Sequence, residues 1–237
     1  GGRILGWDPD SAKLRGLVRS CRIRPARSNR ELADGSDVIL LAVKPQLWRE
    51  TAAEVASLLH PEAVIVSVAA GVQSADIAAA FGRKVARVMP TTAVAIGQGT
   101  TSIYAAEPEA RARARALFGP VGTVVDLDDE VLMHAATAVS GSAPAYLYAF
   151  IEALEAGGAA AGLPVEAAQR LARSTIAGAA ALLAQSGEEP AELRRQVTSP
   201  GGTTQAALEV LMGEGGLSPL LRDAVAAALR RSKELGA

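Results

Sequence analysis

The sequence predicts an α/β fold in which a doubly wound parallel sheet precedes an all-helical region. Two observations predict this class. The first 127 residues alternate short apolar runs with helical segments, and strands that are apolar on both faces are typical of parallel sheets covered by helices. Beyond residue 127 the strand pattern ends, and apolar side chains recur at helical spacing. We therefore expect two domains, residues 1–127 and residues 128–237.

Five apolar runs in the first domain are expected to be strands of one sheet. They cover residues 3–7, 38–43, 63–68, 85–89 and 123–125. A short helix is predicted over residues 28–34. A longer helix is expected to start at Pro45 and to run towards Leu59, because proline is tolerated in a first helical turn.

The second domain is expected to consist of helices separated by four breaks. Residues that stop helices mark these breaks at residues 162–164, 187–190, 199–202 and 213–216. Ser218 followed by Pro219 suits the N-cap and first turn of the last helix. Helices rich in Ala and Gly, such as residues 145–162, can pack closely within the chain or against a second subunit, and the pattern leaves both open.

Composition and charge narrow the choice of partners. The chain has 24 Lys and Arg against 25 Asp and Glu, so no global field attracts nucleic acid or an acidic membrane, and a small-molecule ligand is expected. No apolar run reaches the roughly 18 residues of a membrane span, and no charged leader opens the chain. Cys21 is the single cysteine and His60 and His134 lack metal-ligand spacing, so we expect a cytoplasmic protein without a disulfide or a metal site.

Asp8 follows the first expected strand, where a dinucleotide-binding sheet places the carboxylate that accepts hydrogen bonds from the adenosine ribose. The glycine-rich turn that should precede this strand is absent, so we expect the sequence to lack a first βα unit. A charge at Asp8 would disfavour NADPH, whereas the five arginines between residues 19 and 30 could hold its 2′-phosphate. Two plainer interpretations remain open: a helix-entry turn at Asp8 and a solvated surface of arginines.

Two expected strands end in small residues that suit a flat cofactor. In open α/β sheets, ligands bind at the carboxyl ends of strands. One such end is Ala42 to Pro45, where the backbone more than Lys44 would meet the cofactor, and the next is Ala70 with Gly71.

Residues 198–204, Thr-Ser-Pro-Gly-Gly-Thr-Thr, carry the most specific chemistry. Two glycines free the backbone to point successive N–H groups into one concavity before a helix N-terminus, which would receive a carboxylate. The hydroxyls of Thr203 and Thr204 add donors without burying a charge. The alternative is an ordinary loop with an N-cap.

Residues 140–146, Ser-Gly-Ser-Ala-Pro-Ala-Tyr, are expected to break or kink a helix. Their small side chains would permit tight packing or expose the backbone to a ligand. Thr137, one helical turn before Gly141, could point to the same place. His134 titrates near neutrality and could donate a proton, although a lone histidine on a helix is more often only packed.

Taken in order, five stretches resemble the pyrroline-5-carboxylate reductase family over essentially the whole chain. They are residues 41–45, 69–71, 87–90, 140–146 and 198–204, and the last is the most specific. Three positions depart from the family pattern: Thr91 replaces an asparagine, Ala93 a proline and Ala143 a glycine. The change at Thr91 removes an amide beside the expected nicotinamide position.

The resemblance implies a Rossmann domain, followed by a helical dimerisation domain that forms homodimers and larger homo-oligomers. It implies NADPH or NADH as the cofactor. The residues that would contact the cofactor are Asn29, Val43, Lys44, Pro45 and Ala70.

The resemblance also implies where the substrate binds. Its carboxylate would lie on Gly202, Thr203 and Thr204, with the Thr204 hydroxyl beside the ring nitrogen. Glu130 and Thr137 would be neighbours of this site, with Thr137 a second candidate for a catalytic role.

The reaction implied is hydride transfer to the imine carbon of 1-pyrroline-5-carboxylate, which gives L-proline in the last step of proline biosynthesis. Because the cofactor carries the chemistry, the protein mainly positions its reactants. Two alternatives stay open, reduction of another cyclic imine or keto acid and a non-catalytic dimerisation protein. The missing glycine turn leaves open whether the chain as given is active.

Overall fold

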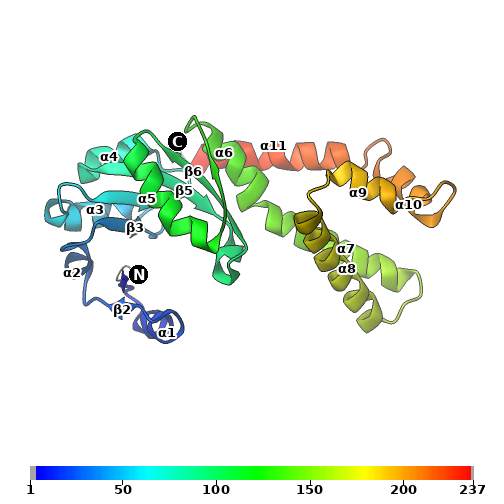
Figure 1. Ribbon diagram of the computed structural model, residues 1–237, viewed down its shortest axis with the longest axis horizontal. Coiled ribbons are helices and arrows are strands. Elements are labelled where there is room, and N and C mark those ends of the chain that lie inside the picture. The colour runs from blue at the N-terminus through cyan, green and yellow to red at the C-terminus, as the bar shows by residue number, and fades with distance from the viewer. Residues whose placement is uncertain (1–3, 236–237) are drawn as a thin grey trace. The chain divides into compact units, whose positions relative to one another are not determined.

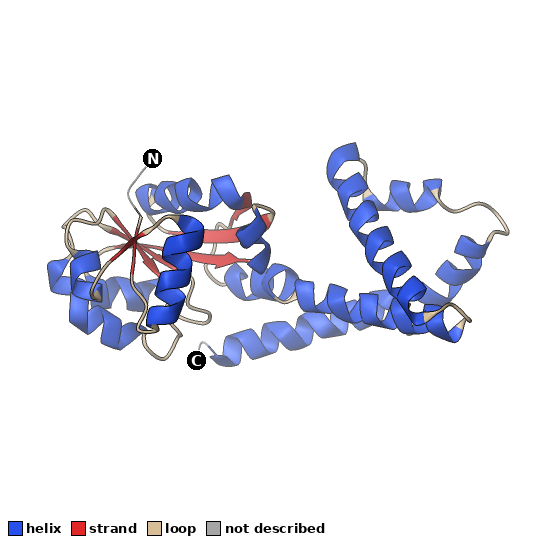
Figure 2. Cartoon of the chain, turned by 90° about the horizontal axis from the view of Figure 1, so that it is seen from below, coloured by secondary structure: helices blue, strands red, loops and turns tan. Residues whose placement is uncertain are grey.

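A computed structural model describes residues 4–235 of the chain (Figure 1). The chain packs as two compact units, one drawn from Gly1–Gly141 with Leu229–Ala237 and the other from Ser142–Ala228. All strands of the described residues belong to the first unit, and the second unit is helical (Figure 2). The expected order of an α/β region before a helical region is confirmed.

The first unit is built on a sheet of five strands in the order β3-β4-β5-β6-β7. These strands are β3 (Val38–Leu41), β4 (Val64–Ser67), β5 (Lys84–Pro90), β6 (Gly99–Ala105) and β7 (Gly122–Asp126). The first three run parallel, β6 is antiparallel to β5, and β7 is parallel to β6. The sheet is therefore mixed, whereas the sequence predicted parallel strands only.

Two strands were not predicted. β6 buries Thr101 and Ser102 beside Ile103, so its sequence lacks the apolar run that marks its neighbours. β2 (Arg24–Pro25) is only two residues long and pairs in parallel with β1 (Leu5–Gly6) in a separate small sheet.

Helices cover both faces of the five-stranded sheet, as a doubly wound fold requires. α3 (Trp48–Val55) and α4 (Ser74–Phe81) pack on one face. α5 (Pro108–Phe118) packs on the other face. Alternate residues of each strand point to the two layers, so that Ile65 joins the first core cluster and Val64 the second.

Capping residues explain where the first helices begin. Asp10 caps α1 (Ser11–Cys21), and the Ser28 hydroxyl caps α2 (Asn29–Ala33) by accepting the Glu31 N–H at 3.2 Å. The longer helix does not start at Pro45, because the Leu47 N–H closes a turn onto the Lys44 carbonyl at 2.9 Å. α3 starts at Trp48 instead and continues into the 3₁₀ turn η1 (Ala56–Leu58).

The four predicted breaks separate the later helices as expected. These helices are α7 (Ala143–Ala160), α8 (Val165–Ser186), α9 (Pro190–Gln196), α10 (Thr203–Leu211) and α11 (Leu217–Leu235). Ser218 is not the N-cap of the last helix, because α11 begins at Leu217. None of the helices within residues 4–235 combines the length and apolarity needed to cross a membrane.

Within the second unit, α7 and α8 pack through small residues. A Cβ atom on Gly158 would lie 3.2 Å from the Cβ of Ala168, so the two helices approach closely there. Large apolar side chains on α8 and α10 remain exposed, including Leu171, Leu182 and Val210. The small residues thus serve packing within the chain, while the large ones remain available for a partner.

Candidate functional site

The carboxyl ends of β3, β4 and β5 meet at one edge of the sheet. Leu41 pairs with Ser67, and Ser67 pairs with Arg87 in the parallel register. The loops that follow, residues 42–45 and 68–73, therefore start side by side. The expected cofactor contacts Ala42 to Pro45, Ala70 and Gly71 belong to these loops. Gly71 has a φ of +79°, which glycine adopts without strain.

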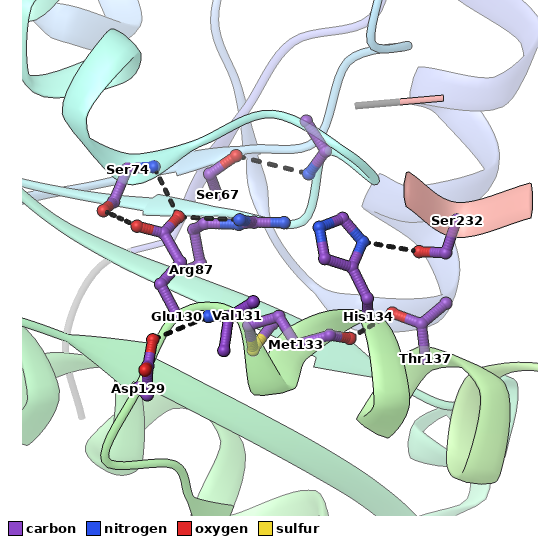
Figure 3. A network of polar contacts seen from close by, with 11 residues as sticks. Ser67, Ser74, Arg87, Asp129, Glu130, Val131, Met133, His134, Thr137 and Ser232 are labelled. Carbon is purple, nitrogen blue, oxygen red and sulfur yellow. Dashed lines mark hydrogen bonds and ion pairs between the residues drawn. The ribbon is translucent and has the colours of Figure 1, made fainter. Parts of the chain in front are cut away.

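Arg87 places a buried positive charge next to the carboxyl end of β4. Its side chain is 5% exposed and lies on the sheet face that α3 and α4 cover. One guanidinium nitrogen, Nη1, donates a hydrogen bond to the Glu130 carboxylate at 2.6 Å (Figure 3). Because a buried charge without a partner is costly, this ion pair explains how an arginine is accommodated in an otherwise apolar strand.

Glu130 accepts hydrogen bonds on both carboxylate oxygens from residues of the chain. Oε1 accepts from Arg87 and from the Ser74 N–H at 2.7 Å, and Oε2 accepts from the Ser74 hydroxyl at 2.6 Å (Figure 3). Burial raises the pKa of the carboxyl, but the hydrogen bonds from Arg87 and Ser74 outweigh burial and lower the pKa below its usual value. The carboxylate therefore stays charged and fixed in place.

Arg87 and Ser74 are parts of this site that the sequence reasoning missed. A signal existed for Arg87, since a charged residue within an apolar strand needs a partner. Ser74 carried no such signal, because a serine at a helix start usually caps its own helix.

His134 and Thr137 follow Glu130 on consecutive helical turns. His134 lies in α6 (Leu132–Ala136), and Thr137 begins the π-helical turn η4 (Thr137–Gly141). The Thr137 hydroxyl donates to the Met133 carbonyl at 2.7 Å. A Cβ atom on Gly141 would lie 3.5 Å from Thr137 Cγ2 and 3.6 Å from the Met89 side chain. The π turn therefore packs near the end of β5, and such turns recur at functional sites.

His134 holds the end of α11 within the first unit. Its Nδ1 atom is 3.0 Å from the Ser232 hydroxyl (Figure 3). Burial lowers the pKa of the imidazole, and the positive charges of Arg87 and Lys233 lower it further. His134 is therefore neutral at pH 7, which does not favour it as the proton donor.

Asp8 and Asn29 both have partners within the chain. The Asp8 carboxylate accepts the Asp10 N–H at 2.8 Å, as the helix-entry alternative expects. The Asn29 amide donates to the Glu54 carboxylate at 2.7 Å. Contact of either residue with a cofactor stays a prediction. Within the described residues, no group of three or more His, Cys, Asp or Glu side chains could hold a metal ion.

The loop at residues 198–204 belongs to the second unit, and its two glycines occupy different environments. Gly201 has a φ of +69°, and a Cβ atom on Gly202 would lie 2.5 Å from the Ser199 hydroxyl oxygen. The Gly201 N–H donates to the Gln205 side chain at 2.7 Å, and the Gly202 N–H donates to the Ser199 carbonyl at 3.1 Å.

These two glycine N–H groups already have acceptors within the chain, so their contact with a carboxylate stays a prediction. The remaining donors of this loop are the first-turn amides of α10, which have no acceptor within their own helix, and the Thr203 and Thr204 hydroxyls. Binding of an anion by these remaining donors also stays a prediction.

Known proteins share both halves of this architecture. Residues 130–235 match the family described as pyrroline-5-carboxylate reductase dimerisation, and residues 1–71 match the family described as NADP oxidoreductase, coenzyme F420-dependent. The pyrroline-5-carboxylate reductase of Synechocystis sp. is 42% identical over 98% of this chain and 88% of its own. The chain belongs to the pyrroline-5-carboxylate reductase family. The reductase of Pseudomonas aeruginosa is 40% identical over 98% of this chain and 87% of its own.

Solved structures of pyrroline-5-carboxylate reductases agree with this assignment. The enzyme from Coxiella burnetii has a TM-score of 0.92 and 32% identity, covering 99% of this chain and 88% of its own. The Plasmodium falciparum enzyme, solved with NADP bound, has a TM-score of 0.82 and 26% identity, covering 98% and 87%. The predicted fold, a Rossmann-type sheet followed by a helical dimerisation region, is confirmed.

Proposed function

We propose that this protein reduces 1-pyrroline-5-carboxylate to L-proline with NADPH or NADH, the last step of proline biosynthesis. The observation that carries the proposal is the likeness to reductases of this name over nearly the whole chain. The match of residues 1–71 to an NADP oxidoreductase family supports the cofactor. An NADP-bound relative with the same fold supports it as well.

The carboxyl edge of the sheet fits a nicotinamide cofactor. Its two loops offer main chain and the small side chains of Ala42 and Ala70, and Gly71, where a positive φ favours glycine, adds no side chain. A bound NADPH or NADH supplies the hydride. Ala42 to Pro45, Ala70 and Gly71 hold the cofactor at this edge, while Asp8 and Asn29 bind its more distant part.

The loop before α10 binds the substrate carboxylate. The first-turn amides of α10 and the Thr203 hydroxyl donate to the carboxylate, helped by the positive end of the helix dipole. The Thr204 hydroxyl hydrogen-bonds the ring nitrogen that is protonated in the product. Gly202 lets this loop approach Ser199 closely and so sets the position of Thr203 and Thr204.

The protein works as a homodimer that assembles further, in our proposal. The match of residues 130–235 to a dimerisation family supports this, as do the exposed apolar side chains of α8 and α10. The proposed cofactor domain, residues 1–127, ends just after β7 at Asp126, whereas the first compact unit extends to Gly141 and includes Leu229–Ala237. A single cysteine suits a reducing, cytoplasmic location.

The test compares Thr204→Ala with Thr203→Ala in the full-length protein, following oxidation of NADPH and of NADH with pyrroline-5-carboxylate. A hydrogen bond to a charged group contributes about 1.5–3 kcal/mol, so Thr204→Ala is expected to lower kcat by about 10–100-fold. Thr203→Ala is expected to raise the KM for pyrroline-5-carboxylate with a smaller change in kcat.

Each half of the proposal has its own contrary outcome. An unchanged kcat in Thr204→Ala would contradict the proposed role of Thr204 in the reaction. If the wild-type protein reduces pyrroline-5-carboxylate neither with NADPH nor with NADH, the proposed activity itself is contradicted. The ratio of the two wild-type rates reports whether NADPH or NADH is preferred.

A further inference from the structure

The loop between β4 and α4, residues 68–73, is fixed at both of its ends by side chains. At its start, the buried Ser67 hydroxyl accepts the Ala69 N–H at 3.2 Å. At its end, the Ser74 N–H and hydroxyl both donate to Glu130. Between these two points lies a turn at Gly71, whose positive φ favours glycine.

The start of α4 has an unusual cap. Gln73, the residue before the helix, makes no side-chain capping bond. The cap is instead the carboxylate of Glu130, which lies 56 positions further along the chain. A carboxylate at a helix N-terminus is favourable for both the free N–H groups and the helix dipole.

The same carboxylate is also held by Arg87 of β5, whose Nη1 donates to the oxygen that accepts the Ser74 N–H. Arg87 is buried, so its charge keeps Glu130 ionised and limits the positions that the carboxylate can take. The lowered pKa of Glu130 agrees with this geometry. Ser74, Glu130 and Arg87 therefore connect the helix after the loop to the strand beside it.

We propose that Glu130 is a positioning residue that holds the loop at residues 68–73 in its cofactor-binding conformation through Ser74 and Arg87. This inference rests on the proposed function, because it assigns residues 70 and 71 to the cofactor. It replaces direct contact between Glu130 and the substrate, since both carboxylate oxygens already have partners within the chain.

The experiment compares Glu130→Gln and Ser74→Ala with the wild type in the full-length protein. Direct binding of NADPH is measured by fluorescence titration without substrate, and hydrogen exchange of residues 68–73 is measured without cofactor. Losing an ionic hydrogen bond to a fixed partner is expected to raise the Kd of NADPH about 10-fold in Glu130→Gln and less in Ser74→Ala. Exchange of the loop amides is expected to become faster in both variants.

Steady-state kinetics separates positioning from substrate contact. The KM for NADPH is expected to rise with its Kd, while the KM for pyrroline-5-carboxylate at saturating NADPH stays within about 2-fold of the wild type. The two substitutions act on one contact, so the double variant is expected to show less than the sum of their effects on log Kd.

Glu109→Gln is the matched control. Glu109 pairs with Lys84 at 2.6 Å at the opposite, amino end of β5, so its loss should leave the Kd of NADPH and the loop exchange unchanged. A higher KM for pyrroline-5-carboxylate in Glu130→Gln with an unchanged NADPH Kd would overturn the proposal in favour of substrate contact. A loss of thermal stability alone would also overturn it.

Two further outcomes are distinguishable. If Glu130→Gln does not fold, Ser74→Ala decides, because it keeps the carboxylate, the Arg87 pair and the Ser74 N–H. If the wild type binds NADPH but does not reduce pyrroline-5-carboxylate, the proposed function fails, while the effect of Glu130 on cofactor binding is still measured.

Discussion

His134 shows how burial and neighbouring charges together favour the neutral form of a single side chain. Partial burial of its imidazole lowers the pKa below the usual histidine value, and the positive charges of Arg87 and Lys233 lower this pKa further. Protonation in the folded protein would add a third positive charge to this region. The contact with Ser232 therefore forms with a neutral ring.

This arrangement predicts a loss of stability at mildly acidic pH. Because the pKa of His134 is lower in the folded state, the unfolded state binds its proton first as the pH falls. The contribution of His134 to stability is therefore complete above the usual histidine pKa of about 6.5 and declines below it. Thermal unfolding of the wild type and of His134→Asn, followed over this pH range, is expected to show a flatter pH dependence in the variant.

His60→Asn is the control for this measurement, because His60 is exposed and caps only a local turn. It should keep the wild-type pH dependence. If the unfolding temperature depends equally on pH in the wild type and in His134→Asn, the prediction is contradicted.

For single residues, the sequence predicted those roles that depend on the neighbouring residues in the chain. Gly201 and Gly202 were predicted to be required by the backbone, and the structure shows a separate reason for each. The Arg87 to Glu130 pair was not predicted, because its partners are 43 positions apart. No local spacing connects two side chains that only the fold brings together.

Among the elements, β6 and β7 depend on two glycines that face each other. Gly99 and Gly122 are register partners at the start of these strands. A Cβ atom on Gly122 would overlap the Gly99 carbonyl group, and its φ of +150° with a ψ of −163° is a region that only glycine adopts readily.

Gly122→Ala is therefore expected to be strongly destabilising. A strained backbone of this kind costs about 1–3 kcal/mol, and displacement of β7 from β6 adds to that loss. The expected result is a clear drop in the free energy of unfolding, measured by chemical denaturation.

Gly119→Ala, three residues earlier, is the matched control. Gly119 has a helical φ of −56°, and a Cβ atom added there would have no neighbour within 4 Å. The alanine should leave stability unchanged or raise it by about 0.4–1 kcal/mol. Equal destabilisation by both substitutions would show that neither the close approach nor the backbone angle at Gly122 matters.

The elements that the sequence predicted well are those with one dominant local signal. β3, β4 and β5 have apolar runs, and the four helix breaks have glycine or proline. β6 was missed because its polar residues are buried in the sheet. The starts at Pro45 and Ser218 were wrong because proline and serine permit a helix start without requiring one.

For the whole molecule, the proposed oligomer makes a measurable prediction. Leu182 on α8 is 55% exposed within the region that matches a dimerisation family. Leu182→Asp is expected to shift the protein towards smaller species in sedimentation velocity, because a charge would have to be buried in an apolar interface.

Leu117→Asp is its control. Leu117 on α5 is 41% exposed but lies outside the matched region, so this variant should sediment like the wild type. The same shift in both variants would point to unfolding or general repulsion. An unchanged distribution for Leu182→Asp would place the interface elsewhere.

The overall order of the two regions could be predicted, because each has its own periodicity. The return of Leu229–Ala237 to the first unit could not. α11 keeps one helical pattern along its length, and nothing in that pattern marks where its packing partners change. The contact between His134 and Ser232, 98 positions apart, is visible only in the folded chain.

This return has a consequence for biosynthesis. Residues 4–141 leave the ribosome before the second unit and can form their sheet while later residues are still being made, since domains usually fold in order of synthesis. Ser232, however, is translated only after the whole second unit, Ser142–Ala228. The first unit therefore waits until the second unit has been translated before His134 meets its partner, and a nascent chain stalled after Ala228 would carry an unfinished unit that chaperones or proteases could still recognise.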